Sequence, residues 1–200
     1  MPRTPEQNQN IKDKRRSKLL NHALKAFAMH GYDRTAIDDI TKSAKCSHGL
    51  FYHYFDSKEK VFSALINEVL TGELRVPLDL ALEQGSVRGI RTLCNYAANV
   101  ARSGGRLGYV AKITVFLPDA TSLDEDAQAF ADAYNVEKAL VTLIRQGQED
   151  GKVIAGNPNQ IARAFLYLVK GGILQSAKKG PWDIDADIPY GMFLKTPITD

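Results

Sequence analysis

The sequence lacks long hydrophobic runs and contains little cysteine. No stretch approaches 18 uninterrupted apolar residues, so the sequence predicts no membrane-spanning helix. Residues 1–10 are polar and lack the apolar core of a signal peptide, so we expect a protein that stays in the cytoplasm. The two cysteines, Cys46 and Cys94, are too few for a disulfide framework and form no CxxC pair, so we expect both to be reduced.

Familiar catalytic motifs are also missing. The sequence contains no HExxH, P-loop, GxGxxG or CxxC pattern. All four histidines, His22, His30, His48 and His53, lie near the N-terminus, which leaves none for chemistry in the remainder of the chain. The sequence therefore predicts no enzyme, no cofactor and no metal site.

Charge is distributed unevenly along the chain. The net charge is +3, but residues 1–60 hold 12 Lys and Arg against 7 Asp and Glu. Residues 61–200 hold 14 Lys and Arg against 16 Asp and Glu. A basic head on a mildly acidic body suits contact between the head and a polyanion such as DNA, although charge alone is equally consistent with a solvated basic face.

The pattern of apolar residues indicates an all-α protein. Alternating β-branched runs are few, and the breakers fall at helical spacings. We expect a flexible arm over 2–10 and a helix over 13–30 that Gly31 ends. A long helix from 57 should be bent or ended by Pro77. Further helices are expected at about 86–103, 106–117, 123–150 and 158–178, followed by an irregular tail over 181–200.

Two short helices are expected between residues 35 and 55. Thr35, with Asp38 three residues later, matches a capping box, while Ser47 and Ser57 are placed to cap the next two helices. A tight turn at Lys45 and Cys46 joins the short helices, which fits a helix-turn-helix with a recognition helix for the major groove. Its expected core is Ile37, Ile40, Ala44, Cys46, Phe51 and Phe55.

Over residues 11–65 the sequence resembles the TetR family. The stretch 31–40, GYDRTAIDDI, is similar to the first half of the family signature. The stretch 44–59, AKCSHGLFYHYFDSKE, is similar to the second half. The resemblance implies a three-helix DNA-binding domain over 1–56, a helical effector-binding and dimerisation domain over 57–180, and then the tail over 181–200.

The resemblance also implies roles for residues of the head. Tyr52 and Tyr54 should reach the DNA backbone, and Lys58 and Thr35 should bind phosphates. His48, Gly49, Leu50 and His53 are placed to read bases. The full set of candidate DNA-binding residues is Thr35, Lys45, Ser47, His48, Gly49, Leu50, Tyr52, His53, Tyr54 and Lys58.

Some of these residues also have simpler interpretations. Taken singly, the two tyrosines could be packing residues, the histidines surface residues and Lys45 a solvated side chain. Ala36 stands where the family often has a hydroxyl, so one phosphate hydrogen bond should be missing. Leu50 replaces a common small polar residue, so it either meets a thymine methyl group or packs.

The remainder of the chain is expected to dimerise and to bind an effector. Long apolar helices over about 124–178 predict a homodimer, in which Gly171 and Gly172 mark either a close helix crossing or a kink or local helix end. Aromatic residues of the middle helices could line a pocket for a small molecule, or could be ordinary core. The candidates are Tyr109, Phe116, Phe130 and Tyr134.

The function that these features favour is a repressor released from a palindromic operator by a small-molecule effector. An enzyme is the first alternative, which turnover of a metabolite would reveal. A DNA-binding subunit that responds to a protein partner is the second, which a body without a large cavity would favour.

Overall fold

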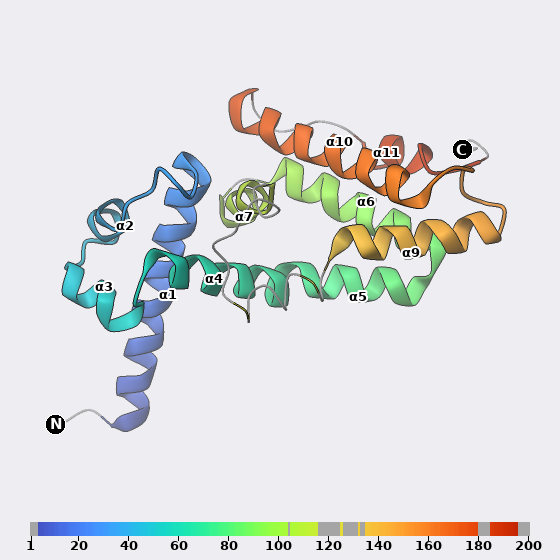
Figure 1. Cartoon of the computed structure of the whole chain (residues 1–200). Helices are drawn as coiled ribbons and strands as arrows, with labels where there is room; N and C mark the ends of the chain where they lie inside the picture. Colours follow the sequence, from blue (N-terminus) through green and yellow to red (C-terminus); the bar gives the residue numbers. More distant parts are fainter. Residues whose placement is uncertain are drawn as a thin grey trace.

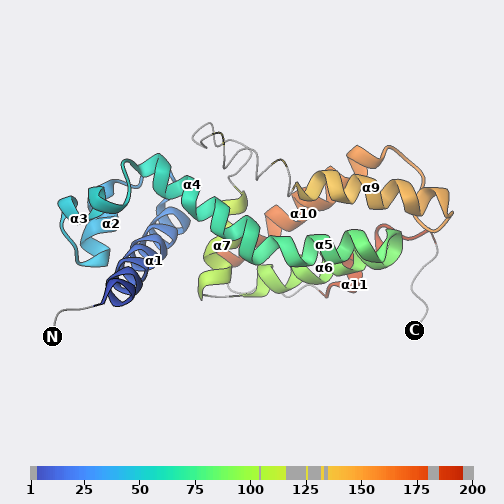
Figure 2. The same cartoon turned by 90° about the horizontal axis from the view of Figure 1, so that it is seen from below.

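The computed structural model describes residues 4–103, 105–115, 125, 132, 135–179 and 185–195. Within these ranges the chain is helical apart from its turns and one isolated β-bridge, as the sequence predicts. A small head formed by α1, α2 and α3 lies at one end of an elongated helical body, and α4 leads from one to the other (Figures 1 and 2). None of the described helices combines the length and apolar character that a membrane crossing needs.

The first helix, α1 (Pro5–His30), is longer than expected. The flexible arm predicted over 2–10 is wrong for residues 5–10, because Thr4 caps the helix and Pro5 stands in its first turn. The Thr4 hydroxyl accepts from the Gln7 backbone N–H at 3.2 Å, and the Gln7 side chain accepts in return from the Thr4 N–H. Gly31, at φ 81°, ends the helix as predicted.

The two short helices are α2 (Ile37–Ala44) and α3 (His48–Tyr54). They pack against α1 and the start of α4 (Lys58–Val69) around one core. All six residues predicted for the helix-turn-helix core belong to this cluster, where Ile40, Ala44, Phe51 and Phe55 are buried and Ile37 and Cys46 are half-buried. The prediction of that core is confirmed.

A π-helical turn, η1 (Leu70–Leu74), joins α4 to α5 (Arg75–Gln84). The expected break at Pro77 is wrong, because Pro77 lies in the first turn of α5, where a missing N–H costs little. The irregularity falls at η1 instead, and the Thr71 hydroxyl donates to the Asn67 carbonyl at 2.6 Å beside it. Single π-helical turns inside helices often mark functional positions.

The body is built from α6 (Ser86–Arg102), α7 (Gly105–Val115), α9 (Val136–Glu149) and α10 (Pro158–Lys179). Its core joins side chains of α5, α6, α9 and α10. Glycines bring helices close together there: a Cβ added at Gly89 would lie 2.1 Å from the Ala81 carbonyl oxygen. A Cβ at Gly147 would lie 2.2 Å from Val153 Cγ2.

The tail expected to be irregular contains a helix, α11 (Asp187–Gly191), so that prediction is wrong for residues 185–195. Tyr190 and Phe193 are buried in the body core, and the Phe193 carbonyl accepts from the Ile154 N–H at 2.9 Å. The Arg91 guanidinium on α6 donates to Asp187 at 2.7 Å. Contacts with the body thus order this proline-containing segment, although its local sequence gives no signal for regular structure.

Candidate nucleic-acid interface

The core of the head holds α3 in place by its inner face. Phe51 is fully buried, and its ring centroid lies 6.1 Å from that of Phe55, which follows the helix. The turn before α3 is tight: Lys45 adopts a left-handed conformation at φ 54°, and the Cys46 N–H donates to the Thr41 carbonyl at 3.0 Å. The Ser47 hydroxyl accepts from the Leu50 N–H at 3.2 Å, which confirms the predicted cap.

The outer face of α3 is open to solvent. His48, Gly49 and His53 are exposed, and 51% of Tyr52 is accessible. A Cβ added at Gly49 would meet only the Ser47 hydroxyl, at 3.9 Å, so the backbone here is uncrowded. This face can approach a groove closely, and its polar side chains belong to types that read base edges.

Leu50 and Tyr54 lie at the border of that face. Both are half-buried, and Tyr54 packs against the core of the head. The packing interpretation of these two residues is therefore part of the structure, whereas their contacts with DNA stay predictions. Lys45 is exposed at the turn, next to the N-terminus of α3.

His48 has a partner that the sequence did not reveal. Its Nε2 atom contacts a carboxylate oxygen of Asp38 on α2, and Asp38 also lies 3.4 Å from the Lys42 ammonium. Asp38 was expected to act in a capping box, but that role belongs to Asp39. The carboxylate of Asp38 instead holds the His48 ring beside α2.

Thr35 does not cap α2, and this prediction is wrong. Only 1% of Thr35 is exposed, and its hydroxyl donates inward to the Gly31 carbonyl at 2.7 Å. Ala36 is the cap residue of α2, and the Asp39 carboxylate accepts from its N–H at 2.9 Å. The Thr35 hydroxyl is therefore not available to a phosphate, although the first amides of α2 still lie at the surface end of the helix.

Lys58 is also bound within the head. Its ammonium donates to the Tyr32 carbonyl at 3.0 Å and lies 4.3 Å from the centroid of the Tyr32 ring. The Tyr32 hydroxyl donates to Glu59 at 2.8 Å, so the loop after α1 is tied to the start of α4. Hydrogen bonds from the Ser57 hydroxyl, its own backbone N–H and Tyr32 lower the pKa of Glu59. The phosphate contact of Lys58 stays a prediction.

A polar contact joins the head to the body at Arg106 on α7. Its guanidinium donates to Asn21 of α1 at 2.6 Å. It also donates to Glu68 of α4 and to Glu73 of η1, both at 3.2 Å. Val110 and Ile113 of α7 are buried in the core of the head. A displacement of α7 would therefore be felt by every element that supports α3.

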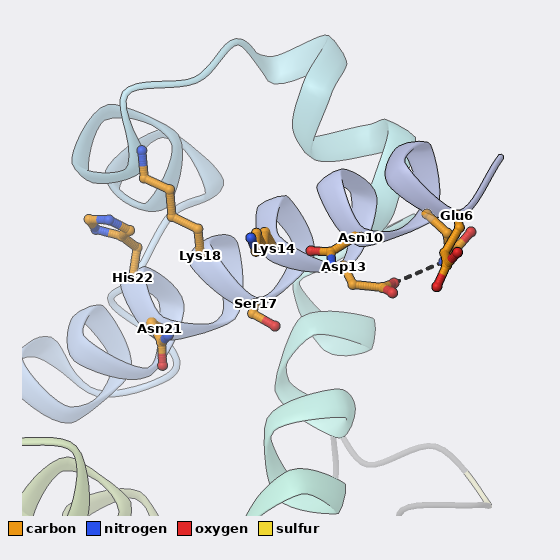
Figure 3. A pocket seen from close by; sticks show the side chains of 9 residues that line it. Glu6, Asn10, Asp13, Lys14, Ser17, Lys18, Asn21 and His22 are labelled. Carbon is orange, nitrogen blue, oxygen red and sulfur yellow. Dashed lines mark hydrogen bonds between the residues drawn. The ribbon is translucent and has the colours of Figure 1, made fainter. Parts of the chain in front are cut away.

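Of the four residues predicted to line the effector pocket, only Tyr109 lies within the described ranges. Tyr109 is half-buried against the head core, with the Lys112 ammonium 5.8 Å from its ring centroid. Phe116, Phe130 and Tyr134 lie outside the described residues. Two hollows in the described part are an open one along α1 (Figure 3) and a groove between α1 and α4, and neither is lined by Tyr109. Its role as a ligand contact stays a prediction.

The described residues include no group of three or more His, Cys, Asp or Glu side chains that could hold a metal ion. Burial raises the pKa of the Cys46 thiol, and the positive charge of Lys18 opposes that shift. Burial also lowers the pKa of His22, together with the charges of Lys18 and Lys25. The effect on Cys46 indicates that Lys18 lies near the turn before α3.

Comparisons with known proteins agree with this geometry. Residues 19–65 match the family described as "Bacterial regulatory proteins, tetR family". The HTH-type transcriptional regulator YfiR of Bacillus subtilis is 33% identical over 187 residues, which cover 87% of this chain and 85% of YfiR. The HTH-type transcriptional repressor DhaR of Mycobacterium sp. is 33% identical over 85 residues, and that match spans 42% of each protein. The crystal structure of AibR in complex with isovaleryl coenzyme A and operator DNA has a TM-score of 0.65, with 20% identity, and the match covers 92% of this chain and 100% of AibR.

Proposed function

Because this chain belongs to the TetR family, whose members are DNA-binding transcriptional regulators and not enzymes, we propose that it is a homodimeric repressor released from a palindromic operator by a small molecule. The observation that carries the proposal is the open face of α3, with Gly49, Tyr52 and His53 exposed beside a capped helix start. DhaR is named as a repressor, which supports repression over activation for this chain. We place the protein in the cytoplasm because bacterial operators are found there.

The first experiment determines the operator sequence. Selection of bound fragments from a random DNA pool should return an inverted repeat, because a two-fold protein reads a two-fold site. On that operator, His53→Ala should relax base preference at one position in each half-site, by about 1–3 kcal/mol. His53 lies one turn beyond Gly49 on the same face of α3, and the chain can approach the groove at that glycine.

Tyr52→Phe is the matched control, because it removes one hydroxyl from the same exposed face. It should weaken binding to all operator variants alike, since a backbone contact carries no base information. Binding is measured over all single-base variants of the selected site. A selected site without inverted symmetry, or a His53→Ala variant that keeps the wild-type ranking, would contradict this part of the proposal.

The dimer interface that we propose lies on α10. Ala164, Tyr167, Gly171 and Leu174 are exposed at intervals of three or four residues, and 68% of Tyr167 is accessible. An apolar face of this kind on a long helix suits a four-helix bundle with a second copy. The helix continues through Gly171, so a helix end is excluded there, whereas a kink and a close crossing are both compatible with a continuous helix.

Gly171→Leu should weaken the homodimer at least tenfold. In the single chain nothing lies within 4 Å of a Cβ at this position, so the added side chain meets only a partner helix. Sedimentation over a concentration series should give about twice the 22.1 kDa chain mass for the wild type and a shift towards monomer for the variant. Glu83→Leu on α5, also exposed, is the control and should leave the equilibrium unchanged. A Gly171→Leu dimer of wild-type strength would exclude a close crossing at this glycine.

Release of DNA by an effector would act through α7. A ligand that binds more tightly to one position of α7 than to another would change the contacts of Arg106 with α1 and α4. The size of the shift is limited by the difference between the two affinities. AibR is described in complex with both isovaleryl coenzyme A and operator DNA, which supports binding of both kinds of ligand by this fold, whereas release of the DNA by an effector is our own proposal. The identity of the effector is to be found by screening metabolites for release of the selected operator.

A further inference from the structure

The N-terminal half of α1 is helical but contributes no buried side chain, and its main contact is Arg16, whose guanidinium lies 5.1 Å from the centroid of the Phe55 ring. The family match begins at residue 19, whereas α1 begins at Pro5. Residues 5–18, which we call the extension, are exposed except for the half-buried Ile11. Figure 1 shows this half of the helix projecting downwards beyond α3 and the rest of the head. Fourteen helical residues span about 20 Å, so the extension reaches well past the core that supports α3.

Basic and acidic side chains lie on adjacent faces of the extension, and Glu6, Asp13, Lys14 and Lys18 all line the hollow along α1 (Figure 3). Lys18 lies four residues after Lys14 and three after Arg15, so the three side chains lie on one side of the helix. We call them the basic stripe. Glu6 and Asp13 are seven residues apart and therefore lie together on another face, where Gln9 donates to Asp13 at 2.9 Å. Within the described ranges no residue of the basic stripe forms an ion pair.

The end of the basic stripe at Lys18 lies beside the turn that leads into α3. Figure 3 shows the Lys18 side chain directed towards the turn that joins α2 and α3, with Lys14 one turn away along α1. The charge of Lys18 acts on the Cys46 thiol in that turn. Ser47, which caps α3, follows directly. The stripe thus continues the surface that α3 presents to DNA.

We propose that the basic stripe binds phosphates of the operator outside the base pairs that α3 reads. The inference rests on the DNA-binding function of the head. Phosphate is the complementary charge, and a duplex held by α3 continues in both directions past the groove that the helix occupies. Contacts of this kind add affinity and salt dependence without adding base preference.

The double variant Lys14→Gln/Lys18→Gln tests the proposal. Glutamine keeps the helix propensity of lysine and removes its charge. Each lost phosphate contact should lower the slope of log affinity against log salt by about 0.9, so a dimer should lose about 3–4. The ranking of operator variants should not change. Arg88→Gln, an exposed arginine on α6 in the body, is the matched control and should leave the slope at its wild-type value.

Duplex length provides a second measurement that needs only the wild type. Trimming the operator to the inverted repeat should weaken wild-type binding at least tenfold and leave the double variant almost unaffected. Equal slopes for the wild type and the double variant, or equal wild-type affinity for long and trimmed duplexes, would overturn the proposal. Wild-type protein that selects no DNA site at all would instead overturn the function on which it rests, so the two failures are distinguishable.

Discussion

Phe193→Ala should lower the free energy of unfolding by about 3–5 kcal/mol. The ring is 2% exposed and lies in the body core, 5.2 Å between centroids from the ring of Phe165 on α10. Its removal leaves a cavity between α10 and the segment that carries α11, and the surrounding helices can close it only in part. For a chain of this size the melting temperature should fall by about 2–4 °C for each kcal/mol, as followed by circular dichroism.

Met192→Ala is the control, because Met192 is the preceding residue and is 56% exposed. It should change stability by no more than about 0.5 kcal/mol. The variants are compared at equal protein concentration, since the stability of the proposed dimer would depend on it. If Phe193→Ala melted with Met192→Ala, the C-terminal segment would not be part of the folded core in solution.

The second large effect is expected at Gly89 on α6. Gly89→Ala should destabilise the chain by about 2–3 kcal/mol, although alanine is the better helix former. The new methyl group would lie 2.1 Å from the backbone oxygen of Ala81 and 2.9 Å from Leu143 Cδ2. A backbone atom cannot turn away as a flexible side chain can, so α5 and α6 must separate and α9 must follow.

Gly72→Ala provides the comparison for this substitution. Gly72 lies in η1, and nothing is within 4 Å of a Cβ placed there. We expect the stability of this variant to equal or slightly exceed that of the wild type, by urea unfolding monitored at equal concentration. A Gly89→Ala variant as stable as Gly72→Ala would mean that the close contact between α5 and α6 is relaxed in solution.

Most of the helices could be predicted from the sequence because their ends depend on local chemistry. Gly31 ends α1, and Ser47 and Ser57 accept hydrogen bonds from N–H groups of the turns that follow them. The helix-turn-helix core was predicted from the spacing of apolar residues. Every expected member belongs to the observed cluster. These features need no knowledge of distant residues.

Where two local solutions compete, the sequence did not decide between them. Thr35 and Asp39 can both serve the start of α2, and the structure uses the Asp39 carboxylate because the Thr35 hydroxyl is buried against the end of α1. The break expected at Pro77 was misplaced for a similar reason, because a proline fits the first turn of a helix as readily as it fits a loop.

Contacts between residues far apart in the sequence could not be predicted. Lys58 binds the Tyr32 carbonyl, 26 residues away, and Arg106 contacts Asn21, 85 residues away. The packing of Phe193 likewise depends on α10 and on the chain after α9. A single sequence contains no local signal for such pairs, so the candidate site could be located but not its internal partners.

The π-helical turn has a consequence for operator geometry. Each residue added to or removed from a helix turns everything beyond it by about 100° around the axis. Because η1 (Leu70–Leu74) stands between α4, which leads out of the head, and α5, its residue count would set the angle at which each head leaves the dimer that we propose. Substitutions on α3 would then alter which bases are chosen, whereas a one-residue change in η1 would alter how far apart the two half-sites must be. In the proposed dimer, half-site spacing and base preference would thus depend on separate parts of the chain, so that a change in one need not alter the other.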